Sequence, residues 1–227
     1  KDYCLEIGIT PNRTDALGHI GVARDLYAYL MIHHTNIGFK KSLQFPDISV
    51  YQSKQDDLKI NVEVLDNDLC PLYLGVCIKN VIVKDSPNWL KNKLISIGLK
   101  SVNNVVDITN FVLHETGNPL HAFDYNKLSN NQIIVRQAKL GESFISLDGS
   151  ELKLQPDNLV VCDDKNILCL AGIMGGSHSA VQSSTEDIFL ECAYFSPSSV
   201  RRTSKAHAIL SDSSYRFERG VDFNNCE

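Results

Sequence analysis

The alternation of hydrophobic and polar positions divides the chain into a helical beginning, a central run of short strands and a helical end. Apolar residues at helical spacing predict a helix over about residues 17–32. The preceding residues 3–9 are typical of a strand, and the short oxygen-bearing side chain of Thr14 or Asp15 is expected to cap the helix. Residues 36–57 are polar and interrupted by proline, which indicates a linker.

The centre of the chain is rich in short stretches with strand-like patterns. Residues 58–65 alternate between polar and apolar side chains, and residues 72–83 are β-rich over a length that predicts one long strand. Further strands are expected at residues 132–138, 143–149, 158–163, 167–173 and 187–195. Dipeptides rich in Gly or Asp between these stretches indicate the turns.

Helical patterns flank this run of strands. Four further helices are predicted, at residues 86–98, 102–117, 197–210 and 212–220. In the first of them Ser86 is the expected cap and Pro87 the first helical residue, and Gly117 ends the second as a residue with positive φ. Helices, then a run of strands, then helices predict an α+β fold rather than an alternating β-α-β order.

The composition is that of a protein able to bury a substantial core, because 43% of the 227 residues are hydrophobic. No window approaches eighteen consecutive apolar residues and no secretory signal is visible, so the sequence predicts neither a membrane span nor secretion. The net charge of −5 provides no overall attraction for nucleic acid, so RNA contacts are expected only from a local patch or from further parts of a longer protein. The start at Lys1 without a methionine is expected for a piece of such a protein.

Seven cysteines are scattered along the chain, and none of them forms a CxxC pair. An odd number at wide spacing is typical of reduced thiols in a cytosolic protein rather than of a disulfide framework. No pair has the spacing of zinc ligands, so no metal site is predicted.

One histidine lies in the middle of an apolar stretch. In ETGNPLHAFDYNKL, residues 115–128, His121 follows Pro119 by two positions and has apolar neighbours, in what the pattern predicts to be a turn. The ordinary interpretation is a core histidine whose ring is satisfied by its surroundings. The alternative is an imidazole that faces a pocket and acts on a ligand.

A single carboxylate interrupts the apolar run IFLECAYF. Glu191 is either a solvated or bridge-forming charge on an edge strand or a buried acceptor that needs a donor, because an unpaired buried charge is costly. A ligand hydroxyl is one candidate for that donor.

Glycines and small polar residues supply two weaker candidates. AGIMGGSHSAV contains Gly172 and Gly175 without the spacing of a phosphate-binding loop or a dinucleotide fingerprint, so a tight turn or a pocket wall is the expected role. His178 beside them is expected to be a surface loop residue. Thr109 and Asn110 belong either to a small local network or to a site, on a helix that is otherwise apolar.

A basic cluster occupies the helical pattern near the end of the chain. Arg201, Arg202 and Lys205 form either a solvated helix face or contacts to RNA phosphates. From the residues alone, the chain is a cytosolic α+β domain with a candidate small-molecule pocket and no nucleophile–base pair adjacent in sequence.

Five blocks in a fixed order make the chain recognisable. They are ITPNRTDALGHIGVARDL, VNNVVDITNFVLHETGNPLHAFD, LAGIMGGSHSAV, IFLECAYFSPSSV and SSYRFERGVD. Each resembles the matching block of bacterial phenylalanyl-tRNA synthetase β subunits. The likeness covers almost the whole chain, apart from about residues 33–60.

The resemblance implies a fold and a function. Residues 1–57 would be an N-terminal helical segment and linker, and residues 58–227 a B3/B4 domain with a β-sandwich-like core flanked by helices. In that family the B3/B4 region hydrolyses tyrosine wrongly esterified to tRNA(Phe). The synthetic reaction, which uses ATP and Mg²⁺, belongs to the α subunit of a cytoplasmic α2β2 enzyme, so the resemblance implies no cofactor for this fragment.

The resemblance also implies roles for particular residues. His121 corresponds to the editing-site histidine and Glu191 to the glutamate that recognises the phenolic hydroxyl of tyrosine. The residues implied to line the pocket or its aminoacyl end are Lys100, Thr109, Asn110, Pro119, Gly172, Gly175, Ser211 and Ser213. Of these, Lys100 stands where relatives often carry arginine, and Ser211 and Ser213 where threonine and a small residue such as alanine are common.

A site that binds the hydroxyl group of tyrosine can distinguish tyrosine from phenylalanine. An apolar pocket rejects an added hydroxyl only weakly, whereas a site built to bond that hydroxyl discriminates against the analogue lacking it by about 10⁴ to 10⁵. A neutral imidazole can orient or deprotonate a water at neutral pH, and the choice between these two roles for His121 stays open. The alternative function is a non-catalytic module that binds tRNA or a protein, or a structural spacer.

Overall fold

The structure, a computed structural model, describes residues 3–34, 42–45, 47–49, 51 and 58–226. Most of the predicted linker, residues 36–57, lies outside the described residues. Within the part that is described, no helix is both long and apolar enough to cross a membrane.

The strands of the described part of the chain form three sheets. The five-stranded sheet has the order β1 (Asn61–Val64), β4 (Gln132–Gln137), β7 (Leu159–Cys162), β8 (Ile167–Leu170) and β9 (Met174–Gly175). The three-stranded sheet has the order β2 (Leu72–Ile78), β10 (Ile188–Tyr194) and β3 (Leu120–Asp124). β5 (Ser143–Ile145) and β6 (Glu151–Lys153) form a separate pair. Only β1 and β4 pair in parallel among these strands.

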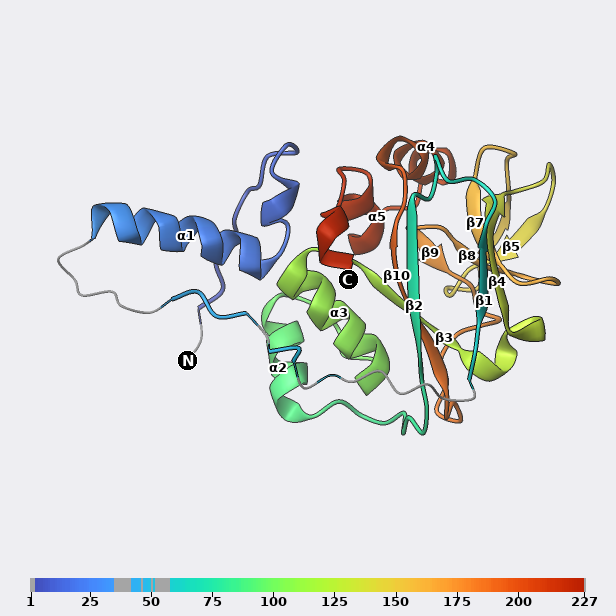
Figure 1. The fold of residues 1–227 in the computed structure, drawn as a ribbon, viewed down its shortest axis with the longest axis horizontal. Helices are drawn as coiled ribbons and strands as arrows, with labels where there is room; N and C mark the ends of the chain where they lie inside the picture. Colours follow the sequence, from blue (N-terminus) through green and yellow to red (C-terminus); the bar gives the residue numbers. More distant parts are fainter. Residues whose placement is uncertain (1–2, 35–41, 46, 50, 52–57, 227) are drawn as a thin grey trace.

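The two larger sheets stand side by side and enclose the core (Figure 1). Phe123 and Phe189 come from the three-stranded sheet and stack with ring centroids 6.3 Å apart. Val135 and Leu168 come from the five-stranded sheet, are fully buried and belong to the same hydrophobic cluster. The predicted α+β class with a sandwich-like core flanked by helices is therefore confirmed.

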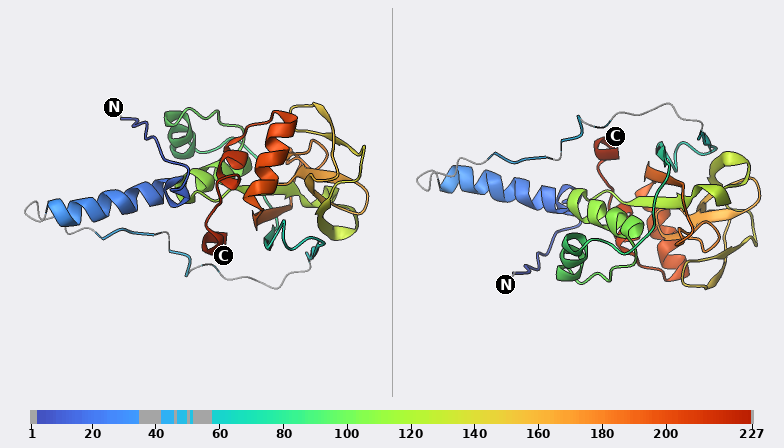
Figure 2. Two further views of the ribbon diagram at one scale, coloured as in Figure 1. Left: turned by 90° about the horizontal axis from the view of Figure 1, so that it is seen from above. Right: turned by 90° about the horizontal axis from the view of Figure 1, so that it is seen from below.

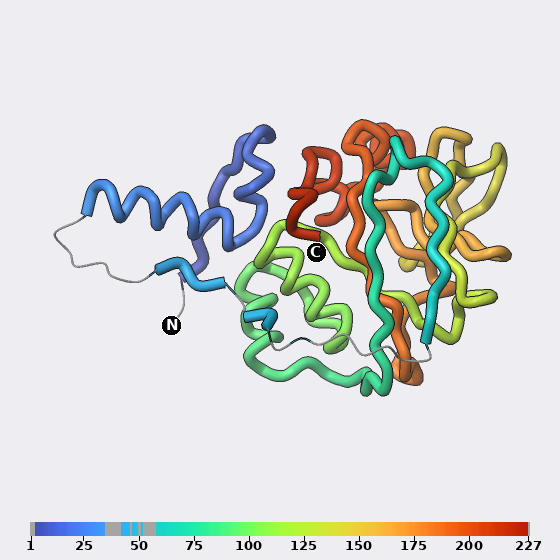
Figure 3. Tube along the Cα trace, in the orientation of Figure 1, coloured from blue at the N-terminus to red at the C-terminus, as the bar shows by residue number. Residues whose placement is uncertain are grey.

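The described residues contain five α-helices. They are α1 (His19–His33), α2 (Asn88–Ser96), α3 (Asn104–Thr116), α4 (Pro197–His207) and α5 (Asp212–Phe217). α2 and α3 cover the side of the three-stranded sheet that faces away from the five-stranded sheet (Figure 3). α1 extends away from this body along the long axis of the molecule (Figure 2).

Both ends of α3 have local signals, and the predicted end at Gly117 is confirmed. The side chain of Asn103 caps α3 by accepting from the backbone N–H groups of Val105 and Val106. α3 ends at Gly117, whose φ of 88° is the predicted positive value. At this position glycine avoids the steric cost that a β-carbon has in the left-handed region.

Three capping and strand predictions at the start of elements are wrong. Residues 3–9 form no strand within the described part of the chain. Thr14 and Asp15 lie in a short 3-10 helix, η1 (Thr14–Ala16), and α1 begins after Gly18 without a side-chain cap. The Ser86 hydroxyl donates to buried Asp107 at 2.5 Å, so Pro87 rather than Ser86 takes the cap position of α2.

Two further predictions about strands are corrected. The long strand expected over residues 72–83 ends at Ile78, and Asn80 then adopts a φ of 55° that interrupts extended backbone. The stretch around His121 is not a turn but the strand β3, which pairs with β10. The apolar residues of β3 pack because the strand lies next to the buried strand β10. This pairing between distant segments is not visible in the local sequence.

Candidate functional site

His121 and Glu191 are directly opposed across two neighbouring strands. In the antiparallel register of β3 and β10, His121 is the partner of Glu191. Residues paired in this way point to the same face of a sheet. On β10 that face also carries buried Phe189, so both functional side chains point into the space between the two large sheets.

A cavity of about 330 Å³, part of it open to solvent, lies beside this pair. The cavity is lined by Pro119, Leu120, His121, Cys169, Gly172, Ile173, Met174, Gly175, Glu191, Ser213 and Phe217. Both sheets and α5 therefore contribute to one site.

Glu191 is a buried acceptor rather than a solvated edge charge. It lies on the central strand of its sheet and is 5% exposed. The hydroxyl of Tyr73 on β2 donates to Oε2 of Glu191 at 2.5 Å, so the donor that burial requires is present within the protein. Burial raises the pKa of Glu191 to about 7, and the hydrogen bond from Tyr73 acts in the opposite direction. At neutral pH the carboxyl group is thus close to its midpoint of ionisation.

His121 carries a neutral imidazole at physiological pH. Part of the residue is still accessible to solvent, yet desolvation lowers the pKa of the imidazole to about 4. The edge of the ring meets Phe123, with centroids 4.5 Å apart. Among the described residues no hydrogen bond to either ring nitrogen is formed, so the imidazole is not the satisfied core histidine of the ordinary interpretation.

The glycine-rich segment between β8 and β9 forms the wall opposite β3. A β-carbon on Gly175 would lie 2.5 Å from Cε1 of His121, so only glycine allows this approach. Gly172 has a φ of 70°, and a β-carbon there would lie 2.9 Å from the ring of Phe217. Both glycines therefore stand in the wall of the cavity.

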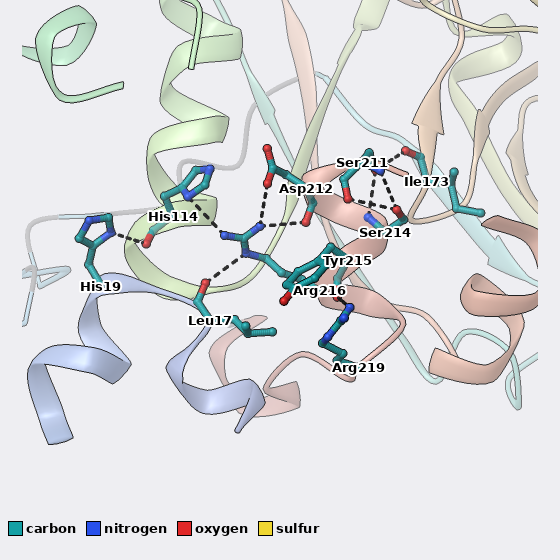
Figure 4. Close-up of polar contacts among 10 residues, drawn as sticks. All are labelled: Leu17, His19, His114, Ile173, Ser211, Asp212, Ser214, Tyr215, Arg216 and Arg219. Carbon is teal, nitrogen blue, oxygen red and sulfur yellow. Dashed lines mark hydrogen bonds and ion pairs between the residues drawn. The ribbon is translucent and has the colours of Figure 1, made fainter. Parts of the chain in front are cut away.

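Ser211 does not line the cavity, but it connects this wall to α5 through hydrogen bonds. Its Oγ accepts from the backbone N–H of Ser214 at 3.0 Å and donates to the carbonyl oxygen of Ile173 at 2.8 Å (Figure 4). The same helix presents Ser213 and Phe217 to the cavity. Ser213 thus lies at the site, and Ser211 supports it.

α5 is in turn attached to the N-terminal part by Arg216. This buried guanidinium donates through Nε to the carbonyl oxygen of Leu17 at 3.2 Å and reaches Nδ1 of His114 at 3.3 Å (Figure 4). It also donates to the carbonyl oxygen of Asp212 at 2.9 Å. His19 of α1 is 2.7 Å from the carbonyl oxygen of His114. The Arg216 side chain therefore links α5 to α3 and to Leu17, just before α1.

Some predicted site residues lie outside the cavity lining. Lys100 is exposed after α2, and Thr109 donates its hydroxyl to the carbonyl oxygen of Val106 within α3. Asn110 follows Thr109 on the same helix. Their predicted contacts with the aminoacyl end stay predictions.

The basic cluster lies on the exposed face of α4. Arg201, Arg202 and Lys205 are all exposed, and Arg202 pairs with Asp157 at 2.6 Å. This arrangement agrees with a solvated helix face, and the predicted RNA contacts stay predictions. His178 is exposed, as expected of a surface residue.

Sequence reasoning missed several residues of the site. Tyr73, Cys169 and Phe217 belong to apolar patterns that are ordinary for core positions, and only their pairing in space brings them to Glu191 or the cavity. The local signal that could have identified Tyr73 is its position two residues before Gly75, a small residue within a strand. No group of three or more potential metal ligands occurs in the described residues.

Comparison with known proteins defines the class of this domain. Residues 69–227 match the family described as the B3/4 domain, and the chain belongs to that family. The resemblance that the five sequence blocks predict is confirmed: the chain is similar over almost its whole length to phenylalanine–tRNA ligase beta subunits.

Two of these relatives illustrate the extent of the similarity. The beta subunit of Bacteroides fragilis is 48% identical over 224 residues, which cover 99% of this chain and 27% of that protein. The beta subunit of Thermotoga maritima is 46% identical over 227 residues, 100% of this chain and 28% of that protein. The chain thus spans little more than a quarter of the relatives that it matches.

One solved structure is also similar. It is the crystal structure of an N-terminal fragment of the phenylalanyl-tRNA synthetase beta subunit from Pyrococcus horikoshii. The match has a TM-score of 0.48 and 16% sequence identity, and covers 93% of this chain and 60% of that one.

Proposed function

We propose that this chain is the editing domain of a phenylalanyl-tRNA synthetase β subunit, which hydrolyses the ester of tyrosine wrongly attached to tRNA(Phe). The observation that carries the proposal is the cross-strand pair of His121 and Glu191 on one cavity. The pair places a polar acceptor and an imidazole on the same small pocket, where a tyrosyl group would meet both.

Glu191 selects the substrate in this proposal. A phenolic hydroxyl donates to the buried carboxylate, whereas phenylalanine leaves that acceptor without the bond. Sites that demand a hydroxyl discriminate by about 10⁴ to 10⁵ against the analogue without one. Correctly charged Phe-tRNA therefore survives.

His121 acts at the ester in this proposal. A pKa of about 4 makes the imidazole a weak base at neutral pH, because general bases work best with a pKa near the operating pH. We therefore assign His121 mainly to accepting a hydrogen bond from the attacking water, which fixes that water near the carbonyl carbon. The terminal ribose hydroxyl of the tRNA is a second group able to share this task.

The remaining residues of the site shape the pocket. Gly172 and Gly175 leave room for the aminoacyl group, and Pro119 and Ser213 complete the lining. The ester and the terminal adenosine extend out of the cavity in this proposal, toward the contacts predicted for the residues Lys100, Thr109, Asn110 and Ser211.

The parent enzyme is part of the same proposal. The chain would belong to a cytoplasmic α2β2 synthetase that attaches phenylalanine to tRNA(Phe) with ATP and Mg²⁺, through a site on the α subunit. Most of the tRNA contact would come from the rest of that enzyme, with Arg201, Arg202 and Lys205 as the candidate contacts from this domain. The net charge of −5 supports this division of labour.

The proposal is tested by deacylation of Tyr-tRNA(Phe) by the complete α2β2 enzyme carrying His121→Ala or Glu191→Ala. Loss of the imidazole is expected to slow hydrolysis on the order of 10²-fold, because the attacking water is no longer held near the carbonyl carbon. Loss of the carboxylate is expected to abolish the preference for tyrosyl over phenylalanyl ester. Exposed His178→Ala and Glu63→Ala are the matched controls, and phenylalanylation is the control activity.

Calorimetry with free amino acids separates the proposal from the alternatives. An editing pocket binds tyrosine in preference to phenylalanine. Equal or absent binding of the two amino acids supports a binding module instead. A structural spacer predicts that Glu191→Ala changes stability but leaves mischarging unchanged.

A further inference from the structure

Tyr73 approaches Glu191 from the side away from His121. On β2, Tyr73 pairs with Ala193 and Gly75 pairs with Glu191, so the phenol reaches the carboxylate diagonally across the sheet. Tyr73 packs against the core cluster and does not line the cavity, whereas Glu191 does. The central strand thus presents one carboxylate between a phenol on β2 and an imidazole on β3.

Gly75 makes this arrangement compatible with a packed core. A β-carbon at Gly75 would lie 2.1 Å from the ring of Phe189, so the ring occupies the space beside Glu191 that a side chain on β2 would fill. The phenol of Tyr73 is therefore the group from β2 that meets the carboxylate.

The two oxygens of Glu191 have different surroundings. Oε2 accepts from the hydroxyl of Tyr73 at 2.5 Å, and no hydrogen bond to Oε1 is formed by the residues that the structure describes. A carboxylate offers about four acceptor positions, so one bonded oxygen leaves the other free for a ligand. Burial holds the pKa of Tyr73 well above its usual value, so the phenol remains a donor throughout the physiological range.

We propose that Tyr73 is a positioning residue for hydroxyl selection, which holds Oε2 of Glu191 so that Oε1 is presented to a phenol in the cavity. This inference rests on the proposed editing function and adds a residue that determines its specificity. Because the hydrogen bond favours the ionised carboxylate, Tyr73 also keeps Glu191 an acceptor closer to neutral pH than burial alone would allow.

Other titratable groups near Glu191 do not ionise in the same range. They are Cys70 before β2, Tyr73 on β2, His121 on β3, Cys169 on β8 and Cys192 on β10. The pKa of Cys70 is raised to about 12 and those of Cys169 and Cys192 are raised as well, so the thiols stay protonated. His121 is neutral above about pH 5, given its pKa of about 4. Cys226 lies next to Cys192, and their hydrogen bond lowers the pKa of the Cys226 thiol. A transition between pH 6 and 8.5 is therefore assigned to Glu191 by its loss in Glu191→Gln.

The test is the pH profile of kcat/KM for Tyr-tRNA(Phe) deacylation by the complete α2β2 enzyme, corrected for spontaneous hydrolysis. The native enzyme is expected to lose activity as pH falls through about 7, because protonation replaces the charged acceptor by a weaker neutral one. Tyr73→Phe is expected to move this midpoint to higher pH by about one unit, which lowers kcat/KM at pH 7 several-fold while phenylalanylation is unchanged.

The matched control is Tyr125→Phe. Tyr125 is a buried tyrosine, and its hydroxyl donates to the carbonyl oxygen of Lys59 at 3.2 Å rather than to Glu191. This variant is expected to keep the native pH midpoint. If the role of Tyr73 were purely structural, Tyr73→Phe would also keep the native midpoint, and kcat/KM would fall by the same factor at every pH.

Each other outcome has a definite meaning. An unshifted midpoint in Tyr73→Phe, in an enzyme whose deacylation still depends on Glu191, overturns this inference and leaves the editing function intact. Faster deacylation by Tyr73→Phe also overturns it, because Tyr73 would then compete with the substrate. Deacylation that is insensitive to Glu191→Ala and His121→Ala defeats the proposed function, and the inference with it.

Discussion

Gly175 of β9 lies against the imidazole of His121 on β3, so close that a β-carbon on the glycine would be 2.5 Å from Cε1. The contact joins the two large sheets at the cavity. It fixes the position of the ring, which has no hydrogen bond to the described residues to hold it. The geometry of the proposed catalytic histidine therefore depends on the absence of a side chain at residue 175.

Gly175→Ala is expected to displace His121 and to reduce Tyr-tRNA(Phe) deacylation on the order of 10²-fold, the effect of a misplacement of about 1 Å. The measurement is single-turnover deacylation by the complete enzyme. Gly8→Ala is the control, because a β-carbon there meets nothing within 4 Å. Native rates in Gly175→Ala would show that the ring position is not critical.

Glu191→Gln is expected to change how stability depends on pH. The pKa of about 7 in the folded protein is above the ordinary 4.5, so the folded state binds the proton more tightly than the unfolded state. The stability contributed in this way is fully present below about pH 4.5 and is lost as pH rises through about 7. The loss amounts to about 3 kcal/mol.

Urea unfolding of both proteins at pH 5 and pH 8 measures this effect. The glutamine variant gains stability relative to the native protein on going from pH 5 to pH 8. Comparison with the native protein cancels the contribution of His121, whose lowered pKa acts in the opposite direction between about pH 6.5 and 4. An equal difference at both pH values would mean that Glu191 titrates normally.

Arg216→Met is expected to destabilise the protein by about 2 to 3 kcal/mol, because the carbonyl oxygen of Leu17 and the ring of His114 lose a buried charged donor. The released contact should expose residues 13–18 to limited proteolysis. Arg219→Met is the matched control, since Arg219 lies 3.5 Å from the ring of Tyr215 and pairs with Glu218 without touching α1. Identical cleavage patterns for the two variants would contradict the linking role of Arg216.

Gly18→Ala and Gly117→Ala are expected to differ in severity although the two glycines are neighbours. A β-carbon on Gly117 would have ordinary contacts of 3.5 Å or more, so its cost of about 1 kcal/mol comes from the φ of 88°. A β-carbon on Gly18 would lie 2.5 Å from the backbone nitrogen of Gly117, so the backbone must move. In thermal unfolding, the Tm of Gly18→Ala should be well below that of Gly117→Ala. The reverse order would contradict this packing.

Much of the fold was predictable because its signals are local. The helix that ends at Gly117 and the strand around Glu191 were identified from periodicity and from a residue suited to positive φ. The stretch around His121 predicts a turn but forms the strand β3, because Pro119 directly precedes it and its pairing partner Glu191 is 70 residues away. Ser86 failed as a cap for a similar reason, because Asp107 takes its hydroxyl.

The sequence by itself determined the family, the α+β class and the pair of candidate residues, since these depend on residue order, on near neighbours and on recognisable blocks. Only the tertiary structure decided that His121 and Glu191 share a register, that Tyr73 supplies the donor and that Gly175 touches the imidazole. Strand register and burial arise from contacts between distant segments. They also set the pKa of each group, because desolvation depends on the surrounding fold rather than on adjacent residues.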